Sequence, residues 1–159
     1  MEMVSVPESS LVAISRLGLA ALLGAAVGIN RELRAKPAGL RTHALVALGA
    51  ALLTLIGLAL TDPRDTEKFG VASRVLQGLI AGVGFIGGGV ILRREESKEV
   101  HGLSTAASIW VVSAIGVGAG CGLWRTSSAT VVLALVILAL GEPLDRVLRT
   151  HRDNENGDG

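Results

Sequence analysis

Five long stretches with almost no charge divide this chain, and they limit its fold more than any other feature. They cover residues 11–29, 40–60, 71–92, 103–123 and 127–140, and 50% of all residues are hydrophobic. Stretches of about 18 or more apolar residues can cross a bilayer, although the last one here is short. A segment in lipid must satisfy its own backbone hydrogen bonds, so each is expected to be a helix. The pattern predicts an all-α integral membrane protein, a bundle of about five transmembrane helices in a lipid bilayer.

The division into segments follows from the same pattern. Residues 1–10 form a polar N-terminal segment, and residues 11–144 form the transmembrane domain. Residues 145–159 end in the polar sequence RDNENGDG, which predicts a disordered cytoplasmic tail.

The basic residues predict the orientation of the chain. With five spans, the first connection, the third connection and the tail lie on one side of the membrane. Most of the Lys and Arg outside the spans belong to these regions: Arg31, Arg34, Lys36, Arg41, Arg93, Arg94, Lys98, Arg146, Arg149 and Arg152. The other side carries Arg64, Lys68, Arg74 and Arg125. Because basic loops remain in the cytoplasm, we expect the N-terminus outside and the C-terminus in the cytoplasm.

Glycine is concentrated in two of the predicted spans. It costs about 1 kcal/mol relative to alanine inside a soluble helix, whereas in lipid it lets helices approach closely. We therefore expect helix packing through Gly78, Gly82, Gly84, Gly87, Gly88, Gly89, Gly116 and Gly120. Because the third span has glycine on more than one face, that helix is expected at the centre of the bundle. The alternative is that residues 87–89 loosen the helix where something binds or passes.

Two arginines lie within predicted spans. Arg16 either extends its head group to the interface or faces the bundle and needs a carboxylate partner. Arg74 lies one helical turn from Gln77, at the start of the third span. It is expected either to pair with an acid of the preceding loop, which contains Asp62 and Asp65, or to belong to a solvated loop.

A turn leads into the second span. Pro37 and Gly39 are turn residues, and Arg41 and His43 fall in the first turn of the helix that follows. Positive charge opposes the macrodipole there, so a specific partner is expected, either Glu32 or an anionic lipid headgroup. The alternative is that these charges only set the topology. No metal is expected at His43, because no carboxylates cluster near it.

Hydroxyl groups are frequent in the fourth span, at Ser104, Thr105, Ser108 and Ser113. We expect them to bond the helix backbone or a neighbouring helix. The alternative is that they line a polar path.

No signature of an enzyme is found in the sequence. G-x-S-x-G, the phosphate-binding loop and H-E-x-x-H are all missing. The spacing Gly82-x-Gly84-x-x-Gly87 fits a dinucleotide pattern but lies inside a span, so we expect no enzyme and no such cofactor. Only four residues are Phe or Trp and none is Tyr, which leaves little for stacking nucleic acid. Magnesium prefers a few carboxylates with retained waters, so Asp62 and Asp65 are weak metal candidates.

Three stretches together resemble the MgtC/SapB family of bacterial inner-membrane proteins, which includes YhiD-type proteins. They are GINREL and KPAGLRTHALVALGAAL within 28–52, RVLQGLIAGVGFIGGGVILR at 74–93, and HGLSTAASIWVVSAIGVGAG at 101–120. The resemblance covers residues 11–140. It implies these motif positions: Arg31, Glu32, Gly39, Arg41, Thr42, Arg74, Gly78, Gly84, Gly87, Gly89, Gly102, Thr105 and Trp110. Gln77 joins this set as the neighbour of Arg74.

The resemblance implies a small bundle of about five helices, multi-pass in the inner membrane. Its members are tied to growth in low magnesium, acid stress and survival in host cells. It implies either regulation of a membrane complex, such as ATP synthase or another transporter, or transport of magnesium. In the first case the partner is a membrane protein bound through glycine-rich faces, and in the second the chain acts as a homo-oligomer. The cofactor expectation is none, apart from a magnesium ion.

The sequence departs from the family in two places. Many relatives carry a soluble cytoplasmic domain, often ACT-like, after the bundle, whereas eighteen residues follow Gly141 here. We therefore expect no ligand sensing by such a domain. The loop TDPRDTEKFGVASR differs from a shorter Asp-Pro-x-Arg connection in relatives, so either Asp62 or Asp65 matches the family acid.

Overall fold

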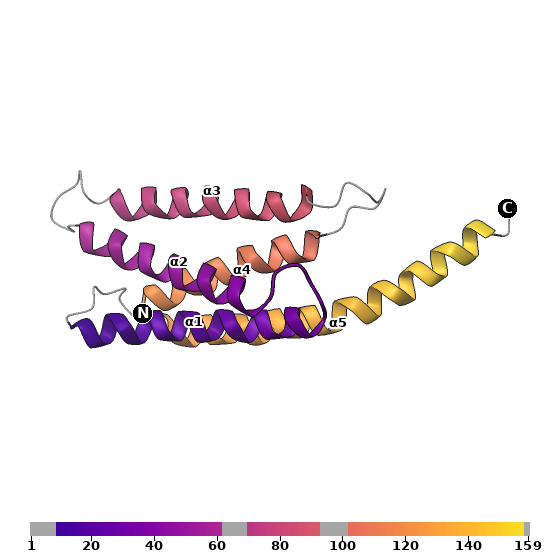
Figure 1. Ribbon diagram of the computed structural model, residues 1–159, viewed down its shortest axis with the longest axis horizontal. Helices are drawn as coiled ribbons and strands as arrows, with labels where there is room; N and C mark the ends of the chain where they lie inside the picture. Colours follow the sequence, from indigo (N-terminus) through magenta and orange to yellow (C-terminus); the bar gives the residue numbers. More distant parts are fainter. Residues whose placement is uncertain (1–8, 62–69, 93–101, 158–159) are drawn as a thin grey trace.

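The computed structural model describes residues 9–61, 70–92 and 102–157. Within these residues it has five helices (Figure 1): α1 (Ser10–Leu33), α2 (Leu40–Leu60), α3 (Val71–Leu92), α4 (Leu103–Gly120) and α5 (Trp124–Gly157). Each contains a stretch that is long and apolar enough to cross a membrane. The prediction of an all-helical membrane protein with five spans is confirmed.

The turn between α1 and α2 follows local sequence signals. Ala35 has a φ angle of 51°, and the Lys36 N–H donates to the carbonyl oxygen of Arg31 over 3.0 Å, which closes the last turn of α1. Pro37 and Gly39 complete the turn, and α2 begins at the next residue. The predicted turn is therefore confirmed, and it brings the end of α1 beside the start of α2.

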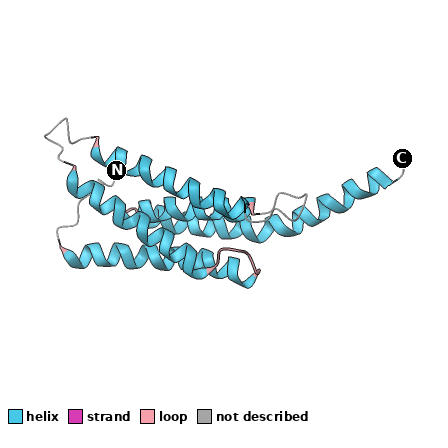
Figure 2. Cartoon of the chain, turned by 45° about the horizontal axis from the view of Figure 1, so that its top comes forward, coloured by secondary structure: helices cyan, strands magenta, loops and turns pink. Residues whose placement is uncertain are grey.

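Successive helices run in opposite directions (Figure 1). The ends of α1 and α3 and the starts of α2 and α4 share one end of the bundle, which we call the Arg31 end. The start of α3 and the ends of α2 and α4 share the other end, which we call the Arg74 end. The two views in Figures 1 and 2 show this up-and-down arrangement.

The core is enclosed mainly by α1, α2 and α4. Helix α4 contacts each of the other four helices, so it is the central helix of the described chain. The main core cluster contains small and β-branched side chains, which suit closely spaced helices: Ala20, Val27, Ala47, Ala51, Val112, Ile115, Ala119 and Val131.

Glycines bring the backbones of the core helices together. A Cβ atom on Gly116 of α4 would collide with the carbonyl oxygen of Ala47 in α2. A Cβ on Gly120 would lie 2.8 Å from the carbonyl oxygen of Ala51, one turn further along α2. Carbon atoms do not approach backbone so closely, so this contact between α2 and α4 requires glycine.

The expectation that the third span lies at the centre of the bundle is wrong. Of the other four described helices, α3 contacts α2 and α4 and neither α1 nor α5. A Cβ on Gly87 would lie 3.5 Å from the Cβ of Ala106 in α4. The other predicted packing glycines of α3 have no described atom within 4 Å of the position of a Cβ: Gly78, Gly82, Gly84, Gly88 and Gly89. Small residues permit a close approach, but they do not determine which helix makes it.

Helix α5 differs from its prediction at both ends. It begins at Trp124 rather than at residue 127, and it continues as one helix to Gly157 rather than ending near residue 144. The expectation of a disordered tail from residue 145 is therefore wrong for residues 145–157. A helix already nucleated within the bundle adds residues at little cost, which polar composition alone does not reveal. Figure 1 shows the C-terminal half of α5 extending beyond the other helices.

Candidate functional site

A buried arginine joins α1 to α4 at the Arg31 end. Arg31 lies in the last turn of α1, and only 1% of its surface is exposed. Its Nη2 donates hydrogen bonds to the hydroxyl oxygens of Thr105 over 2.9 Å and Ser104 over 3.2 Å. Burying a charge is costly unless it is hydrogen-bonded, so these contacts hold the two helices in one arrangement.

The next residue, Glu32, joins α1 to α2. Its Oε2 accepts a hydrogen bond from the backbone N–H of Leu40 over 2.8 Å. This N–H belongs to the first residue of α2 and has no partner within the helix, so the carboxylate acts as an N-terminal cap. Gly39 makes room for it, because a Cβ at residue 39 would meet the Glu32 carboxylate. Two motif positions suggested by the family resemblance therefore act together.

His43 extends the polar cluster from α2 to α4, and it is fully buried. Its Nδ1 lies 2.9 Å from the carbonyl oxygen of Gly39, and its Nε2 lies 3.0 Å from the hydroxyl oxygen of Ser108. Because a carbonyl only accepts, Nδ1 carries the proton of this bond. The Ser108 hydroxyl oxygen also lies 2.8 Å from the carbonyl oxygen of Thr105, and its single proton is donated either to that carbonyl or to Nε2 of His43. Both ring nitrogens are thus engaged in joining two helices.

We call these residues the Arg31 cluster: Arg31, Glu32, Gly39, His43, Ser104, Thr105 and Ser108. The sequence pointed to most of them separately, but it did not pair His43 with Ser108. The signal was present, because Ser104 and Ser108 are four residues apart and share one face of α4. The hydroxyls bond helix backbone and neighbouring side chains, as the packing interpretation predicts; Ser113 likewise donates to the carbonyl oxygen of Trp110 over 2.7 Å.

Gly102 places the start of α4 against the end of α3. It has a φ angle of 92°, which favours glycine, and it caps α4. A Cβ there would also lie 3.0 Å from the carbonyl oxygen of Val90. The positive φ angle and this close approach together explain why residue 102 is glycine. It lies three residues before Thr105, at the edge of the Arg31 cluster.

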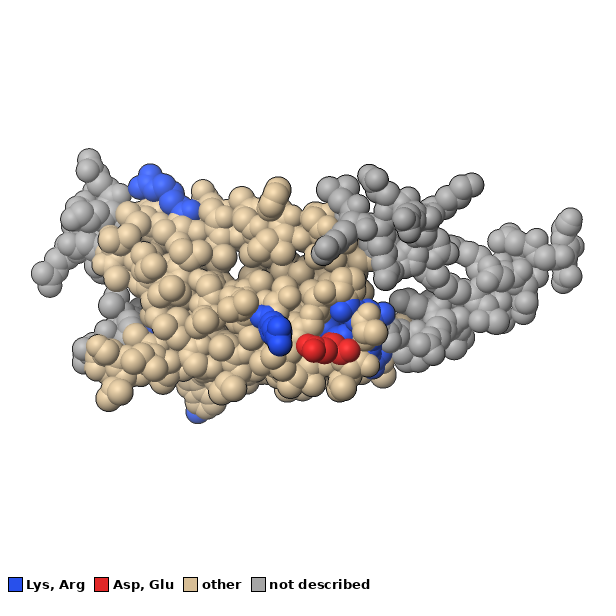
Figure 3. Space-filling view, in the orientation of Figure 1, with Lys and Arg blue, Asp and Glu red and all other residues tan. Residues whose placement is uncertain are grey.

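The surface around the Arg31 cluster carries charge. Arg41 is exposed in the first turn of α2, and Thr42 beside it is half-buried. Arg34 and Lys36 lie in the preceding turn. Figure 3 shows basic atoms beside a small acidic patch near this end of the described surface. The cluster thus has a buried polar interior and a charged exterior.

Other predicted site residues lie elsewhere. Arg74 and Gln77 are exposed near the start of α3, so the length of the bundle separates them from the Arg31 cluster. Trp110 is 52% exposed on α4. The metal candidates Asp62 and Asp65 lie outside the described residues. The part of the chain that the structure describes contains no group of three or more His, Cys, Asp or Glu side chains that could hold a metal.

Arg16 faces the bundle at the Arg74 end. Its Nη1 donates to the carbonyl oxygen of Gly120, at the end of α4, over 3.0 Å. A Cβ on Gly122 would lie 2.9 Å from this guanidinium, and the φ angle of Gly122 is 84°. Of the two readings of Arg16, the structure favours the one in which it faces the bundle, where a backbone carbonyl is one of its partners. A cation suits a helix C-terminus, where carbonyl groups lack partners.

These features define a multi-pass helical membrane protein with a buried, hydrogen-bonded arginine cluster at one end of its bundle. Residues 17–147 match the model of the MgtC family, and the chain belongs to that family. The recognition made from the three sequence stretches is confirmed.

Several curated proteins are similar to this chain. SrpB of Synechococcus elongatus is 37% identical over 92% of this chain and 85% of its own length. "Putative magnesium transporter YhiD" of Escherichia coli K12 is 40% identical over 79% of this chain and 58% of its own length. MgtC of Salmonella typhimurium is 38% identical over 84% of this chain and 54% of its own length. The chain therefore spans little more than half of YhiD or MgtC. No solved structure matches it.

Proposed function

We propose that this chain is a regulatory membrane protein of magnesium homeostasis and stress adaptation. It acts by binding another membrane complex, such as ATP synthase or a transporter, in the bacterial inner membrane. Its N-terminus lies outside and its C-terminus in the cytoplasm, as the distribution of basic residues favours. The link to magnesium rests on family membership and on the printed name of YhiD. It performs no reaction of its own.

The observation that carries this proposal is the outer face of α3. Ala81, Gly84 and Gly88 are three and four residues apart, so they share one face of that helix. Ala81 and Gly84 are exposed, and no described atom lies within 4 Å of a Cβ position at Gly84 or Gly88. In lipid, such a face allows a second helix to approach closely. We call it the α3 outer face and assign the partner to it.

The Arg31 cluster supports regulation over transport by one chain. A cation pathway needs oxygen ligands or negative charge along its length. The described interior instead contains a guanidinium at the Arg31 end, and backbone contacts of Gly116 and Gly120 close the space between α2 and α4. Magnesium transport remains the second candidate, because the name of YhiD favours it.

ATP-driven proton pumping tests the regulatory proposal. Inner-membrane vesicles containing ATP synthase are compared with and without the protein, together with Gly84→Leu and its matched control Gly18→Leu. Gly18 is also open, but it lies on α1. We expect the native protein and Gly18→Leu to change the pumping rate equally and Gly84→Leu to lose the effect. Equal effects of both variants would remove the α3 outer face from the mechanism.

Magnesium uptake into proteoliposomes separates the two candidates. Vesicles contain the protein alone, with empty vesicles and Gly88→Leu beside them, and the inserted orientation is measured by proteolysis. Regulation predicts no uptake above that of empty vesicles. Protein-dependent uptake that Gly88→Leu abolishes would instead support a transporter with α3 on its path. Crosslinking of the α3 outer face in the same vesicles reports a homo-oligomer, which is the form expected for transport.

A further inference from the structure

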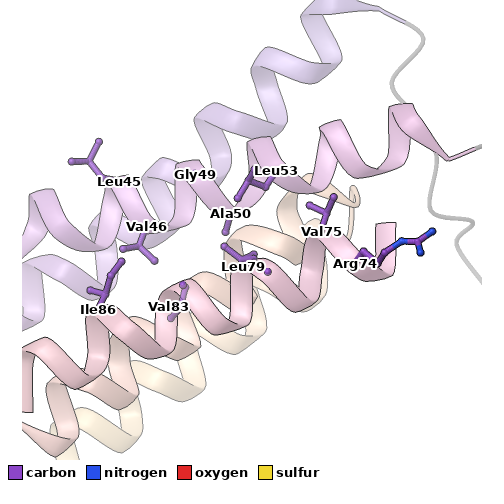
Figure 4. A pocket seen from close by; sticks show the side chains of 12 residues that line it. Leu45, Val46, Gly49, Ala50, Leu53, Arg74, Val75, Leu79, Val83 and Ile86 are labelled. Carbon is purple, nitrogen blue, oxygen red and sulfur yellow. The ribbon is translucent and has the colours of Figure 1, made fainter. Parts of the chain in front are cut away.

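An apolar groove lies between α2 and α3 near the Arg74 end, apart from both the Arg31 cluster and the α3 outer face. It has a volume of about 660 Å³, a size typical of ligand sites. Its walls are aliphatic (Figure 4) and include Leu45, Val46, Leu53, Leu79, Val83 and Ile86.

Missing side chains create this groove. Gly49 lies on its α2 wall, and Gly78 and Gly82 lie on its α3 wall. No described atom lies within 4 Å of a Cβ position at any of these three glycines. A larger residue at any of these positions would place its side chain in or beside the groove. The groove therefore depends on glycine in both helices.

The groove is slightly longer than one leaflet of a bilayer and much shorter than the whole hydrocarbon core. It extends along α3 from Arg74 to Ile86. Twelve residues of helix rise about 18 Å. Half of a hydrocarbon core of about 30 Å is about 15 Å. One residue beyond Ile86 the neighbour of α3 changes to α4, because a Cβ on Gly87 would lie 3.5 Å from the Cβ of Ala106. A partner helix would need a face along the whole bilayer, whereas an acyl chain needs one leaflet.

A single cation stands at the open end of the lining. Among the described residues that line the groove, Arg74 is the one that carries a charge, and it is exposed in the first turns of α3. Figure 4 shows its head group at one end of the row of side chains, directed away from the aliphatic ones. Among the described residues, no carboxylate pairs with Arg74. A guanidinium above an apolar groove matches the charge and polarity of a phospholipid, whose phosphate lies above its acyl chain.

We propose that this groove binds one phospholipid from the leaflet at the Arg74 end. One acyl chain lies between α2 and α3, and the phosphate accepts hydrogen bonds from the Arg74 guanidinium. The lipid fills the space that the glycines leave and holds α3 against α2. This site is independent of the regulatory partner proposed above, because Gly78 and Gly82 face the groove and not the α3 outer face.

Lipid titration followed by native mass spectrometry tests this site. The delipidated protein in detergent is titrated with phosphatidylglycerol, and with diacylglycerol of the same chains as a probe without phosphate. Gly49→Leu and Gly82→Leu fill the groove from opposite walls, and Gly18→Leu is the control. Arg74→Gln removes the charge, and its control is Arg125→Gln, an exposed arginine over the Trp124 ring at the same end. Thermal unfolding of each variant checks its fold.

We expect one phosphatidylglycerol to bind tightly to each monomer. Arg74→Gln lowers this affinity about fivefold, the effect of one basic residue near an anionic surface. Either leucine variant lowers it at least as much, whereas both controls bind like the native protein. Equal affinity in all variants, or equal affinity for diacylglycerol, would overturn the proposal. If the native protein is a dimer and only the leucine variants dissociate it, the groove instead binds a second copy of this chain.

Discussion

Arg31 and Thr105 are 74 positions apart in the chain, yet the Nη2 of Arg31 donates to the Thr105 hydroxyl over 2.9 Å inside the bundle. This hydrogen bond joins the last turn of α1 to the first turn of α4. Its neighbours, the Glu32 cap and the bond between His43 and Ser108, join α2 to the same two helices. Three helix ends are therefore held by side chains rather than by apolar packing alone.

Replacing Arg31 is expected to loosen this end of the bundle. Arg31→Ala removes hydrogen bonds from a charged donor to the buried Thr105 hydroxyl and the exposed Ser104 hydroxyl, and such bonds are worth about 1.5 to 3 kcal/mol each. We expect the free energy of unfolding in detergent to fall by at least about 2 kcal/mol. Arg31→Lys restores the charge but not the planar fork, so it rescues only part of this loss. The exposed Arg125→Ala is the control, and a similar change there would argue against the cluster.

The contact between α2 and α4 predicts opposite effects of the same substitution at two glycines. Gly116→Ala places a methyl group against the backbone of Ala47, so overpacking should destabilise the protein by about 1 to 3 kcal/mol. Gly84→Ala adds a methyl group in open space on α3, where helix propensity alone should stabilise by up to about 1 kcal/mol. Denaturant unfolding of both variants measures the difference. Equal destabilisation would mean that α3 is packed as closely as α4.

The cap at the start of α2 can be tested through the acceptor atom of Glu32. Glu32→Ala removes the partner of the Leu40 N–H and should cost about 0.5 to 2 kcal/mol, as the loss of other N-terminal caps does. Glu32→Gln keeps an acceptor oxygen, so it should retain much of that stability. Hydrogen exchange at the Leu40 amide reads out the bond directly. Protection that survives in Glu32→Ala would exclude the carboxylate as the cap.

Arg41 is expected to separate function from stability. It is exposed in the first turn of α2, where its charge opposes the helix dipole. Arg41→Ala should therefore insert and unfold like the native protein, or be slightly more stable, while growth in low magnesium falls. Growth is measured at native expression, with membrane-inserted protein quantified in the same cells. Normal growth of this variant would leave Arg41 with a role in topology only.

Labelling of Cys121 should depend on both pH and Arg16. Burial in the turn after α4 raises the pKa of the Cys121 thiol, and the positive charge of Arg16 lowers it in part. The reactive thiolate is therefore scarce at neutral pH, and maleimide labelling should accelerate as the pH rises. Arg16→Ala removes the charge that favours the thiolate, so labelling at a given pH should be slower. Faster labelling would show that the variant mainly opens the turn.

Several local features were predictable from the sequence. The apolar stretches predicted five helices, and Pro37 and Gly39 predicted the turn before α2. Gly116 and Gly120 were predicted at a packing face, and the structure places both against the backbone of α2. These features depend on residue type and spacing, which act within one or two helical turns.

The central helix could not be predicted in the same way. The glycines of α3 suggested a central position, but α4 has it, and the polar tail did not predict the continuation of α5 to Gly157. A small residue permits contact on its face, and only the packing of all helices together decides which faces are covered.

The sequence by itself determined that this chain crosses a membrane as five helices and belongs to a recognisable family, because apolar length and backbone hydrogen bonding leave few other choices in lipid. Only the tertiary structure decided that Arg31, Glu32 and His43 act together and that Arg74 stands apart beside an apolar groove. The reason is physical. Hydrogen bonds between residues far apart in the chain depend on how the helices cross, and that depends on all of their contacts at once.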